Sequence, residues 1–464
     1  MSRIINTTVA LMFCAAALAA MQTQMPGAGP KPALPAPGDN SKTARFPVVT
    51  GWPDGKAPSA PQGFTVTKYA GDFVYPRWIY VLPNGDVLVS EARSPMRKNL
   101  GEDQQRARLA ARFAGDSPNK ITLLRDADGD GSPEVRETFL ENLEQPFGML
   151  LRGDTFYVAN TNGVVSFPYK TGQTHIAGAG KKILDLPADG YNNHWVRNIV
   201  SNAEGTKFYV SVGSGTNVDV EKSDEKDPRR AAILEVNPNG SGMRVFASGL
   251  RNPNGLAWNP WSGELWTTVN ERDMLGSDLV PDYLTNVPVG AHYGWPWFYW
   301  GENIDERVEH EMPNFLVEYT RTPEYALGPH VAPLGVVFTQ AGSAMGPGFD
   351  HGAFVARHGS WNRKPAAGYD VVYVRFDERG NPLGKPVPVL KSFLKNDDET
   401  RGRPTWVAWD RTGALLVSDD TAGVIWRVSA PGATPVGEQV RNTGERLPPR
   451  EGLVGDPRRA FDEN

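Results

Sequence analysis

A strand–turn–strand pattern recurs along this chain and strongly limits the folds that it can adopt. Each copy holds an apolar run, a turn rich in Pro, Gly, Asn or Asp, and a second apolar run, which is the pattern of an antiparallel hairpin. Similar hairpins at intervals of roughly 50 to 80 residues are typical of a β-propeller, in which each blade is one sheet. The copies occupy residues 78–90, 147–160, 198–212, 255–269, 334–356 and 406–418.

These six copies predict an all-β fold, a six-bladed β-propeller over residues 62–431. A pair of β-sandwiches is the alternative, and it explains the strands and turns but not six comparable hairpins. Residues 283–325, rich in aromatic and charged side chains, fit no blade. We expect them to form a long insertion over one face.

Both ends of the chain lie outside the repeated pattern. Residues 1–19 predict a secretory signal peptide, because Arg3 precedes an apolar run that closes with the small residues Ala17 and Ala19. The run is too short to span a bilayer comfortably, although an uncleaved anchor is the alternative. Residues 20–61 are rich in Pro and Gly and predict a linker or wrapping arm, and residues 432–464 predict a C-terminal tail.

The single cysteine and the charge balance exclude several classes of function. Cys14 lies inside the signal segment, so the mature chain would hold no disulfide, no Cys-ligated zinc and no covalently attached haem. The net charge of −5 is spread along the chain, which argues against nucleic acid as a partner. Export without disulfides is compatible with the periplasm, where we expect this protein.

One acidic segment matches a calcium-binding loop. Asp126, Asp128, Asp130, Gly131 and Glu137 occupy every fixed position of the D-x-D-x-D-G-x5-E pattern. The flanking residues read as strands, so the segment would be a hairpin loop with a structural calcium. A solvated acidic turn is the alternative.

A second group of polar residues stands just before or after the apolar runs. Each of these residues alone is more often a surface residue than a catalyst, but their equivalent places in several repeats would bring them to one mouth of the central channel. Several arginines and histidines around one concave site indicate a polyanionic ligand. The members are Gln145, His194, Arg197, Arg251, Asn252, residues 271–273, His330, Asn362, Arg363, Lys364, Arg401 and Arg403.

Arg401 and Arg403 lie two residues apart, directly before the apolar run at residues 406–409. On an extended chain the side chains of residues i and i+2 point to the same side. We therefore expect both guanidinium groups to face one anionic ligand.

Five motifs in the later repeats resemble those of the pyrroloquinoline quinone (PQQ)-dependent soluble aldose and sorbosone dehydrogenases. They are HWVRN, GLRNPNGLAWNP, HYGWPW, GSWNRKP and RGRPTWVAW, and the likeness covers residues 64–429. The resemblance implies a six-bladed propeller that oxidises a sugar or related aldehyde by hydride transfer to PQQ, with calcium assisting. It also implies an external electron acceptor, either a quinone or a cytochrome.

The same resemblance assigns roles to individual residues. His194 matches the general base that takes the proton of the anomeric hydroxyl. A larger set matches the contacts of the cofactor and of a catalytic calcium. In that set Gln145 is a substrate-side amide, Arg251 and Asn252 hold the quinone, Arg401 and Arg403 clamp carboxylates, and the main-chain carbonyls of Arg272 and Asp273 bind the ion.

The cofactor contacts depart from the family pattern at two places. A family lysine falls at Asn362, where Arg363 and Lys364 stand beside it as substitutes. A family threonine falls at His330.

The acidic residue expected to orient the base is Ser214 here, which leaves Asp189 or Asp219 for that task. Such departures are what a propeller without cofactor, acting as an envelope binding module, would show. A metal-dependent lactonase on a similar propeller is the other alternative. It would need a ring of carboxylates where these repeats place arginines.

Overall fold

The computed structural model describes residues 27–39, 43–189, 192, 194–219, 226–309 and 311–430. The predicted signal segment (residues 1–19) and tail (residues 432–464) lie outside this range. Within it the chain is nearly all β. The two α-helices in this part of the chain are short, α2 (Glu102–Ala110) and α3 (Leu316–Tyr319), and neither is long and apolar enough to cross a membrane.

Most strands belong to antiparallel sheets whose strands pair in chain order. The first three sheets have four strands each. They are β4 (Pro76–Val81), β5 (Val87–Glu91), β6 (Lys120–Arg125) and β7 (Val135–Leu140), then β8 (Met149–Arg152), β9 (Thr155–Asn160), β10 (Gly163–Pro168) and β11 (Lys181–Asp185), then β12 (Ile199–Ser201), β13 (Phe208–Val212), β14 (Ala232–Val236) and β15 (Arg244–Ser248).

The next three sheets follow the same order, and two of them gain a strand from the N-terminal part of the chain. They are β16 (Pro253–Trp258), β17 (Leu265–Val269), β18 (Pro281–Asn286) and β21 (Tyr325–Pro329) with β1 (Ala28–Gly29), then β22 (Pro333–Phe338), β23 (Gly352–Arg357), β24 (Asp370–Phe376) and β25 (Pro382–Leu390), then β28 (Pro404–Trp409), β29 (Leu415–Asp419) and β30 (Val424–Ser429) with β3 (Thr65–Ala70).

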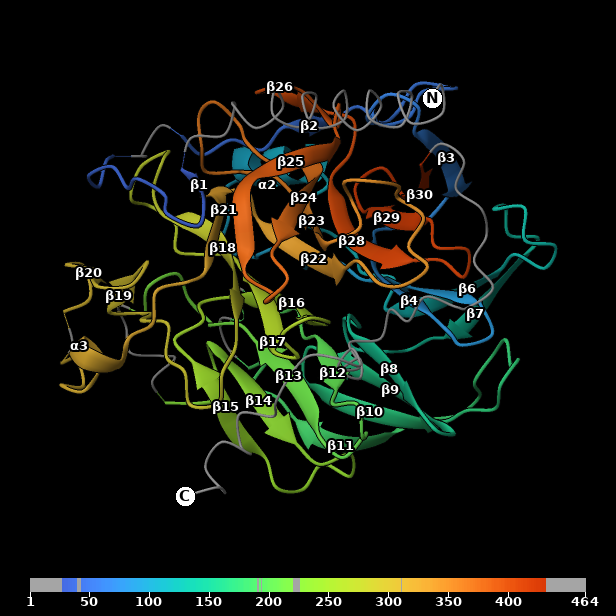
Figure 1. Ribbon diagram of the computed structural model, residues 1–464, viewed down its shortest axis with the longest axis horizontal. Coiled ribbons are helices and arrows are strands. Elements are labelled where there is room, and N and C mark those ends of the chain that lie inside the picture. The colour runs from blue at the N-terminus through green and yellow to red at the C-terminus, as the bar shows by residue number, and fades with distance from the viewer. Residues whose placement is uncertain are drawn as a thin grey trace, which may run out of the picture.

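The first strands of these six sheets touch in a closed ring. β4 contacts β8 and the contacts continue through β12, β16, β22 and β28 back to β4. β3 pairs with β30, so the N-terminal strand completes the last sheet. The arrangement is β-propeller-like (Figure 1), and each predicted hairpin falls on the first two strands of one sheet.

A proline opens the first strand in four of the sheets. At Pro76, Pro253, Pro333 and Pro404 the ladder is interrupted by a register shift immediately after the proline. Proline lacks the N–H that a ladder needs, and a bulge re-aims the neighbouring side chains. The residues just before these prolines therefore stand at the same end of the ring.

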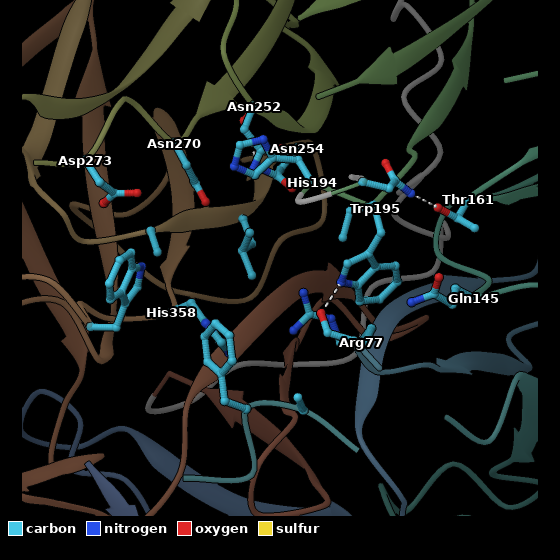
Figure 2. A pocket seen from close by; sticks show the side chains of 18 of the residues that line it. Arg77, Gln145, Thr161, His194, Trp195, Asn252, Asn254, Asn270, Asp273 and His358 are labelled. Atoms are coloured by element: carbon cyan, nitrogen blue, oxygen red, sulfur yellow. Dashed lines mark hydrogen bonds between the residues drawn. The ribbon is translucent and has the colours of Figure 1, made fainter. Parts of the chain in front are cut away.

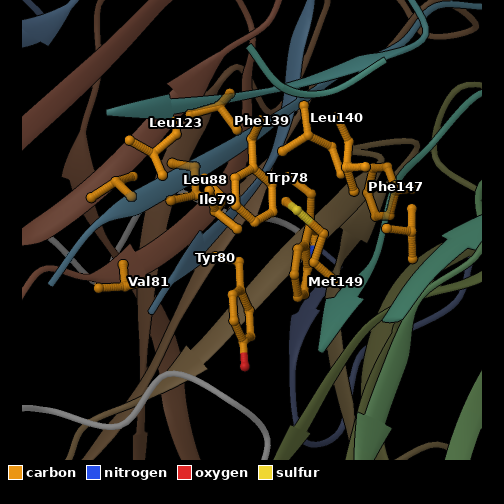
Figure 3. Packing of buried hydrophobic residues seen from close by; sticks show 14 of the residues in the cluster. Trp78, Ile79, Tyr80, Val81, Leu88, Leu123, Phe139, Leu140, Phe147 and Met149 are labelled. Carbon is orange, nitrogen blue, oxygen red and sulfur yellow. The ribbon is translucent and has the colours of Figure 1, made fainter. Parts of the chain in front are cut away.

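The core lies between neighbouring sheets. Trp78, Phe147 and Trp406 come from strands β4 and β28 and from the loop before β8, and all three are buried in one cluster. The Phe147 and Trp406 rings meet edge to face with centroids 5.6 Å apart. Such pairs add about 0.5–1.5 kcal/mol beyond area burial, so aromatic packing locks adjacent sheets together (Figure 3).

The described part of the N-terminal arm crosses the last sheets. β2 (Val48–Val49) pairs in parallel with β27 (Glu399–Thr400), which also pairs with β26 (Leu394–Asn396). Phe46 stacks on Trp361 with centroids 5.8 Å apart. The insertion is shorter than predicted, because residues 283–286 belong to β18 and Tyr325 opens β21. It lies between these two strands and holds β19 (Phe298–Tyr299), β20 (Asn303–Ile304) and α3.

Candidate functional site

A cavity of about 760 Å³ opens where the first strands of the ring begin. The four residues that precede the strand-opening prolines, Tyr75, Asn252, Ala332 and Arg403, all line it. Figure 2 shows side chains from several sheets pointing toward this common space. Its volume suits a drug-sized ligand. A cavity thus lies at the shared end of the repeats, and part of the predicted group lines it.

His194 lines the cavity and is held by Ser214. Its Nδ1 lies 2.9 Å from the main-chain carbonyl oxygen of Ser214 and 3.0 Å from the Ser214 hydroxyl. A carbonyl oxygen can only accept, so Nδ1 carries the proton and Nε2 carries the lone pair. Burial, together with the positive charge of Arg251, holds the pKa of His194 well below its usual 6.5. The neutral imidazole is therefore the form present at neutral pH.

The residues around His194 fix its main chain. Arg197 is fully buried and donates to the carbonyl oxygens of His194 and Val196 at 2.6 and 2.9 Å. The base is thus oriented by a serine carbonyl where a carboxylate was expected. Asp189 lines the cavity, and the buried Asp219 donates its main-chain N–H to the Thr216 hydroxyl at 2.9 Å.

Arg251 lines the cavity as predicted, but its donors face the protein. Its Nε donates to the Asn217 carbonyl, Nη1 to the carbonyls of Asn270 and Glu271, and Nη2 to the Asn217 side chain and to Asp273. These five bonds use every N–H of a guanidinium. Arg251 therefore holds the loops beside His194 together. Its positive charge still acts on the cavity, but it has no N–H group left to donate to a ligand.

Two asparagines in the cavity wall carry buried oxygen acceptors. The Oδ1 atoms of Asn252 and Asn254 are buried and have no hydrogen-bond partner among the described residues, and both residues line the cavity. A buried polar atom without a partner costs about 1–3 kcal/mol. These oxygens are thus suited to a ligand that carries N–H or O–H donors.

A charged cluster that the sequence analysis missed lies across the cavity. Asp420 accepts hydrogen bonds from Arg77 and from Nε2 of His358, the latter at 2.8 Å. Burial alone would raise the pKa of Asp420, but the charges of His358 and Arg77 lower it to about 2. Burial, with the charge of Arg403, lowers the pKa of His358 to about 4. Arg77, His358 and Arg403 all line the cavity.

Arg77 stands inside an aromatic cage. Its guanidinium carbon lies 5.7 Å from the ring centroids of Tyr75 and Phe147 and 5.5 Å from that of Trp195. Its Nε has no hydrogen-bond partner among the described residues. The signal that could have revealed it is positional, because Arg77 follows Pro76 as Asn254 follows Pro253.

Arg401 and Arg403 do not face one ligand. Arg403 donates to the carbonyls of His358 and Gly359 and lines the cavity. Arg401 donates to the Ser392 carbonyl and lies over Trp52 with its guanidinium 5.8 Å from the ring centroid, outside the set that lines the cavity. The expectation was wrong because the chain bends at Arg401 between two strands, so the alternation of an extended chain does not apply.

His330 and Asn362 support Asp273. Nδ1 of His330 lies 3.5 Å from Asp273 Oδ1, and Asn362 Nδ2 lies 3.4 Å from the same oxygen. Burial would raise the pKa of Asp273, but the hydrogen bond from His330 and the charge of Arg251 lower it to about 2. His330 and Asp273 line the cavity, whereas Asn362 stands behind them.

The other two residues of that motif point away. Arg363 forms an ion pair with Asp278 at 2.7 Å and Lys364 is exposed. Neither belongs to the described residues that line the cavity. As substitutes for the family lysine they are therefore misplaced.

Gln145 lines the cavity from the loop before β8. Its backbone φ of 45° lies in the left-handed region, which is costly for a non-glycine residue and is often kept at functional sites. Its Nε2 donates to the Arg93 carbonyl at 3.1 Å.

The expected catalytic calcium does not fit the carbonyl of Asp273. That oxygen accepts from Arg272 at 2.9 Å, from Asn217 at 3.1 Å and from Arg307 at 3.3 Å. Guanidinium cations occupy the position that a calcium ion would need, and like charges repel. Arg272 itself is buried in an ion pair with Asp305. We therefore place no calcium on the Asp273 carbonyl, and the Arg272 carbonyl stays a predicted ligand.

The acidic loop is organised differently from the predicted pattern. Carboxylate oxygens of Asp126, Asp128, Asp130 and Glu134 lie within 4.8 Å of one another. Glu137 does not join them, because β7 begins at Val135 and pairs Glu137 with Leu123 of β6. The fourth predicted calcium ligand was therefore wrong, and Glu134 takes its place in the cluster.

Comparison with known proteins relates the chain to sugar dehydrogenases. A 165-residue stretch is 30% identical to the aldose sugar dehydrogenase YliI of Escherichia coli and spans 33% of this chain but only 42% of that protein. The AA12 enzyme of Trichoderma reesei, solved in a calcium form, superposes with a TM-score of 0.66 at 18% identity, covering 82% of this chain and 98% of that one.

The PQQ domain of the pyranose dehydrogenase from Coprinopsis cinerea superposes with a TM-score of 0.63 at 20% identity, with the same coverage of 82% and 98%. The TrAA12-like family model matches residues 58–287 and 312–431, which include the strands of the ring and the loops that build the cavity. The resemblance to PQQ-dependent aldose dehydrogenases is thereby confirmed, and the chain belongs to the TrAA12-like family.

Proposed function

We propose that this protein is an exported quinoprotein dehydrogenase that oxidises an aldose or a related sugar or aldehyde, with PQQ as the hydride acceptor. The observation that carries the proposal is a neutral His194, fixed by the Ser214 carbonyl, at the edge of a cavity that also holds buried cations and unpartnered amide oxygens. The six sheets and their closed ring of first strands support a six-bladed propeller as the scaffold.

The cavity fits the chemistry of PQQ, a planar tricarboxylate. Arg77 and Arg403 offer positive charge on one side, and Trp195 offers an aromatic face. The unpartnered oxygens of Asn252 and Asn254 would accept hydrogen bonds from ring N–H or hydroxyl groups. Guanidinium groups bind carboxylates more strongly than neutral donors do. The bound cofactor would supply the two-electron acceptor that the protein itself lacks.

The chain's own residues would bind and deprotonate the sugar. Nε2 of His194 would accept the proton of the anomeric hydroxyl, since Nδ1 is already committed to the Ser214 carbonyl. Asp273 lies near enough to stabilise the imidazolium that forms, because its negative charge raises the pKa of His194. Burial and the charge of Arg251 oppose that stabilisation and favour the neutral imidazole, because both lower the pKa of His194.

Calcium and the compartment belong to this proposal as well. We place a structural calcium at the loop formed by Asp126, Asp128, Asp130 and Glu134, away from the cavity residues. The signal pattern at residues 1–19 supports a periplasmic location. The sequence carries no Cys-based haem attachment motif, so electrons would leave to an external acceptor.

Reconstitution tests the proposal. Purified protein titrated with PQQ should give saturable quinone absorbance near one equivalent, and the loaded protein should reduce an artificial dye when an aldose is added. A matched variant, His175→Gln, changes an exposed histidine outside the cavity and should behave as the parent. Failure of PQQ to bind would contradict the enzyme assignment and favour a binding module.

A further inference from the structure

The insertion between β18 and β21 forms a lobe on one side of the molecule. The lobe comprises residues 288–309 and 311–324, with β19, β20 and α3, and stands at the left of Figure 1. The family model matches the chain on either side of residues 288–311 but not across them. Residues 288–311 of the lobe are therefore an addition to the part that the family shares, whereas residues 312–324, with α3, lie within the family match.

Large apolar side chains are exposed on this lobe. Five of them keep between 56% and 67% of their surface exposed, whereas the other seven exposed large apolar side chains among the described residues are spread over the rest of the chain. A concentration of exposed apolar surface marks a site for another molecule. They are Val289, Ile304, Phe315, Val317 and Tyr319.

The charge of the same surface is negative. Its exposed carboxylates belong to Glu302, Glu306, Glu309, Glu311 and Glu318. The lobe has two arginines, and both interact with other groups. Arg321 forms an ion pair with Glu324 at 3.7 Å, and Arg307 donates to the loop that lines the cavity. Residues 288–324 contain no lysine. An acidic rim around apolar residues selects a partner with a basic face and opposes an anionic membrane surface.

The lobe is braced directly on the wall of the cavity. Asp305 forms a fully buried ion pair with Arg272. Arg307 donates to the main-chain carbonyls of Met274 at 3.1 Å and Asp273 at 3.3 Å, and Asp273 and Met274 both line the cavity. A partner bound to the lobe would thus sit one loop away from the proposed cofactor site.

We propose that the lobe is the docking surface for a soluble, basic, one-electron carrier protein of the haem type. The inference rests on the proposed function. Oxidation of one aldose to its lactone releases two electrons and two protons, so each turnover reduces two ferric carriers to the ferrous state and releases two protons to solvent. Docking on an acidic apolar surface beside the cavity shortens the path that these electrons must take.

The test uses the full chain loaded with PQQ, a basic cytochrome c as the probe and an uncharged dye as the second acceptor. The variant Glu306→Lys/Glu309→Lys/Glu318→Lys should lower kcat/KM for the cytochrome at least tenfold at low ionic strength, with unchanged dye-linked turnover. Added salt should lower kcat/KM of the parent for the cytochrome and reduce the difference between parent and variant. A control with the same charge change, Glu141→Lys/Glu204→Lys/Glu378→Lys, alters exposed residues outside the lobe and should match the parent.

Cytochrome binding measured by calorimetry gives a readout that does not need turnover. The parent should bind the ferric cytochrome, and both the charge-reversal variant and Phe315→Ser/Tyr319→Ser should bind it at least tenfold more weakly. Equal binding by parent and variants would overturn the proposal. So would a parent dimer that Phe315→Ser/Tyr319→Ser dissociates without effect on cytochrome reduction. If the parent binds cytochrome but never reduces dye with any aldose, the proposed function fails while the docking surface stands.

Discussion

The imidazole Nδ1 of His194 lies 2.9 Å from the main-chain carbonyl oxygen of Ser214. A backbone acceptor thus fixes the tautomer of the proposed base without a second side-chain charge. Because an acidic partner would raise the basicity of the imidazole, its replacement by a carbonyl leaves His194 neutral to a lower pH. This contact links the local fold of β13 and its following loop to the proposed chemistry.

His194→Gln should leave PQQ binding nearly intact and lower aldose turnover. Removal of a general base costs about 10²- to 10⁴-fold in rate, and glutamine keeps a donor for the Ser214 carbonyl. Dye-linked kinetics and quinone titration on the same preparations check both parts. Turnover within threefold of the parent would remove His194 from the mechanism.

The pH profile should carry the signature of the lowered pKa of His194. Burial and the charge of Arg251 keep its imidazole neutral well below pH 6.5. The acid limb of kcat/KM should therefore fall below pH 6.5, since loss of activity requires protonation of the base. Ser214→Ala keeps the main-chain carbonyl and should leave the acid limb of kcat/KM at the same pH. An acid limb at or above pH 6.5 in the parent would contradict the lowered pKa of His194.

Arg403 and Arg401 should differ sharply in their effect on cofactor affinity. Arg403→Ala removes a buried cavity cation and should weaken PQQ binding at least tenfold, because a charge-assisted bond contributes about 1.5–3 kcal/mol. Arg401→Ala alters a residue outside the cavity and should change affinity less than twofold. Circular dichroism confirms that each variant folds. An equal loss of PQQ affinity in both variants would contradict this, because it would mean that the two arginines bind one ligand together.

The acidic loop should bind calcium through Glu134 and not through Glu137. Glu134→Gln and Asp126→Asn should each abolish any rise in Tm on adding calcium, because their oxygens belong to the cluster. Glu137→Gln lies on β7 and should keep that rise. PQQ affinity should remain unchanged in all three. A quinone lost together with calcium would show that the two sites are coupled.

Glu271 should make the fold less stable as pH rises. Burial raises the pKa of its carboxyl from 4.5 to about 8, even though the charge of Arg251 opposes the shift. Between these two values the folded protein holds a proton that the unfolded chain releases, so the free energy of unfolding falls as pH rises through this window. Glu271→Gln should flatten that dependence in denaturant titrations, and an unchanged slope would refute the raised pKa.

Much of the fold followed from local pattern. Turn residues such as those at 83–86 and 410–413 locate each hairpin to within a few residues. The repetition of the hairpin then predicts the propeller-like arrangement of the sheets. The shared end of the ring was also predictable, because polar residues cluster before prolines such as Pro253 and Pro404. Arg77 was missed although it follows the same proline signal.

The details of the site depended on contacts between distant segments. Nothing near Arg251 in the sequence shows that Asn217 and residues 270–273 consume its donors. Likewise Arg307 reaches the Asp273 carbonyl from the lobe, and Asp305 of the lobe pairs with the guanidinium of Arg272 beside that carbonyl. The bend at Arg401 is a tertiary effect, because the arm strand β2 pairs with β27 just before it.

The central claim, that sugar oxidation passes through PQQ in this cavity with His194 as base, is tested most directly by a single turnover. Protein loaded with PQQ is mixed with an excess of aldose in the absence of any electron acceptor, and the absorbance of the bound quinone is followed. The account predicts complete reduction of the cofactor in the parent and at least a hundredfold slower reduction in His194→Gln at equal occupancy. Bound quinone that no aldose reduces, or that both proteins reduce at the same rate, would contradict it.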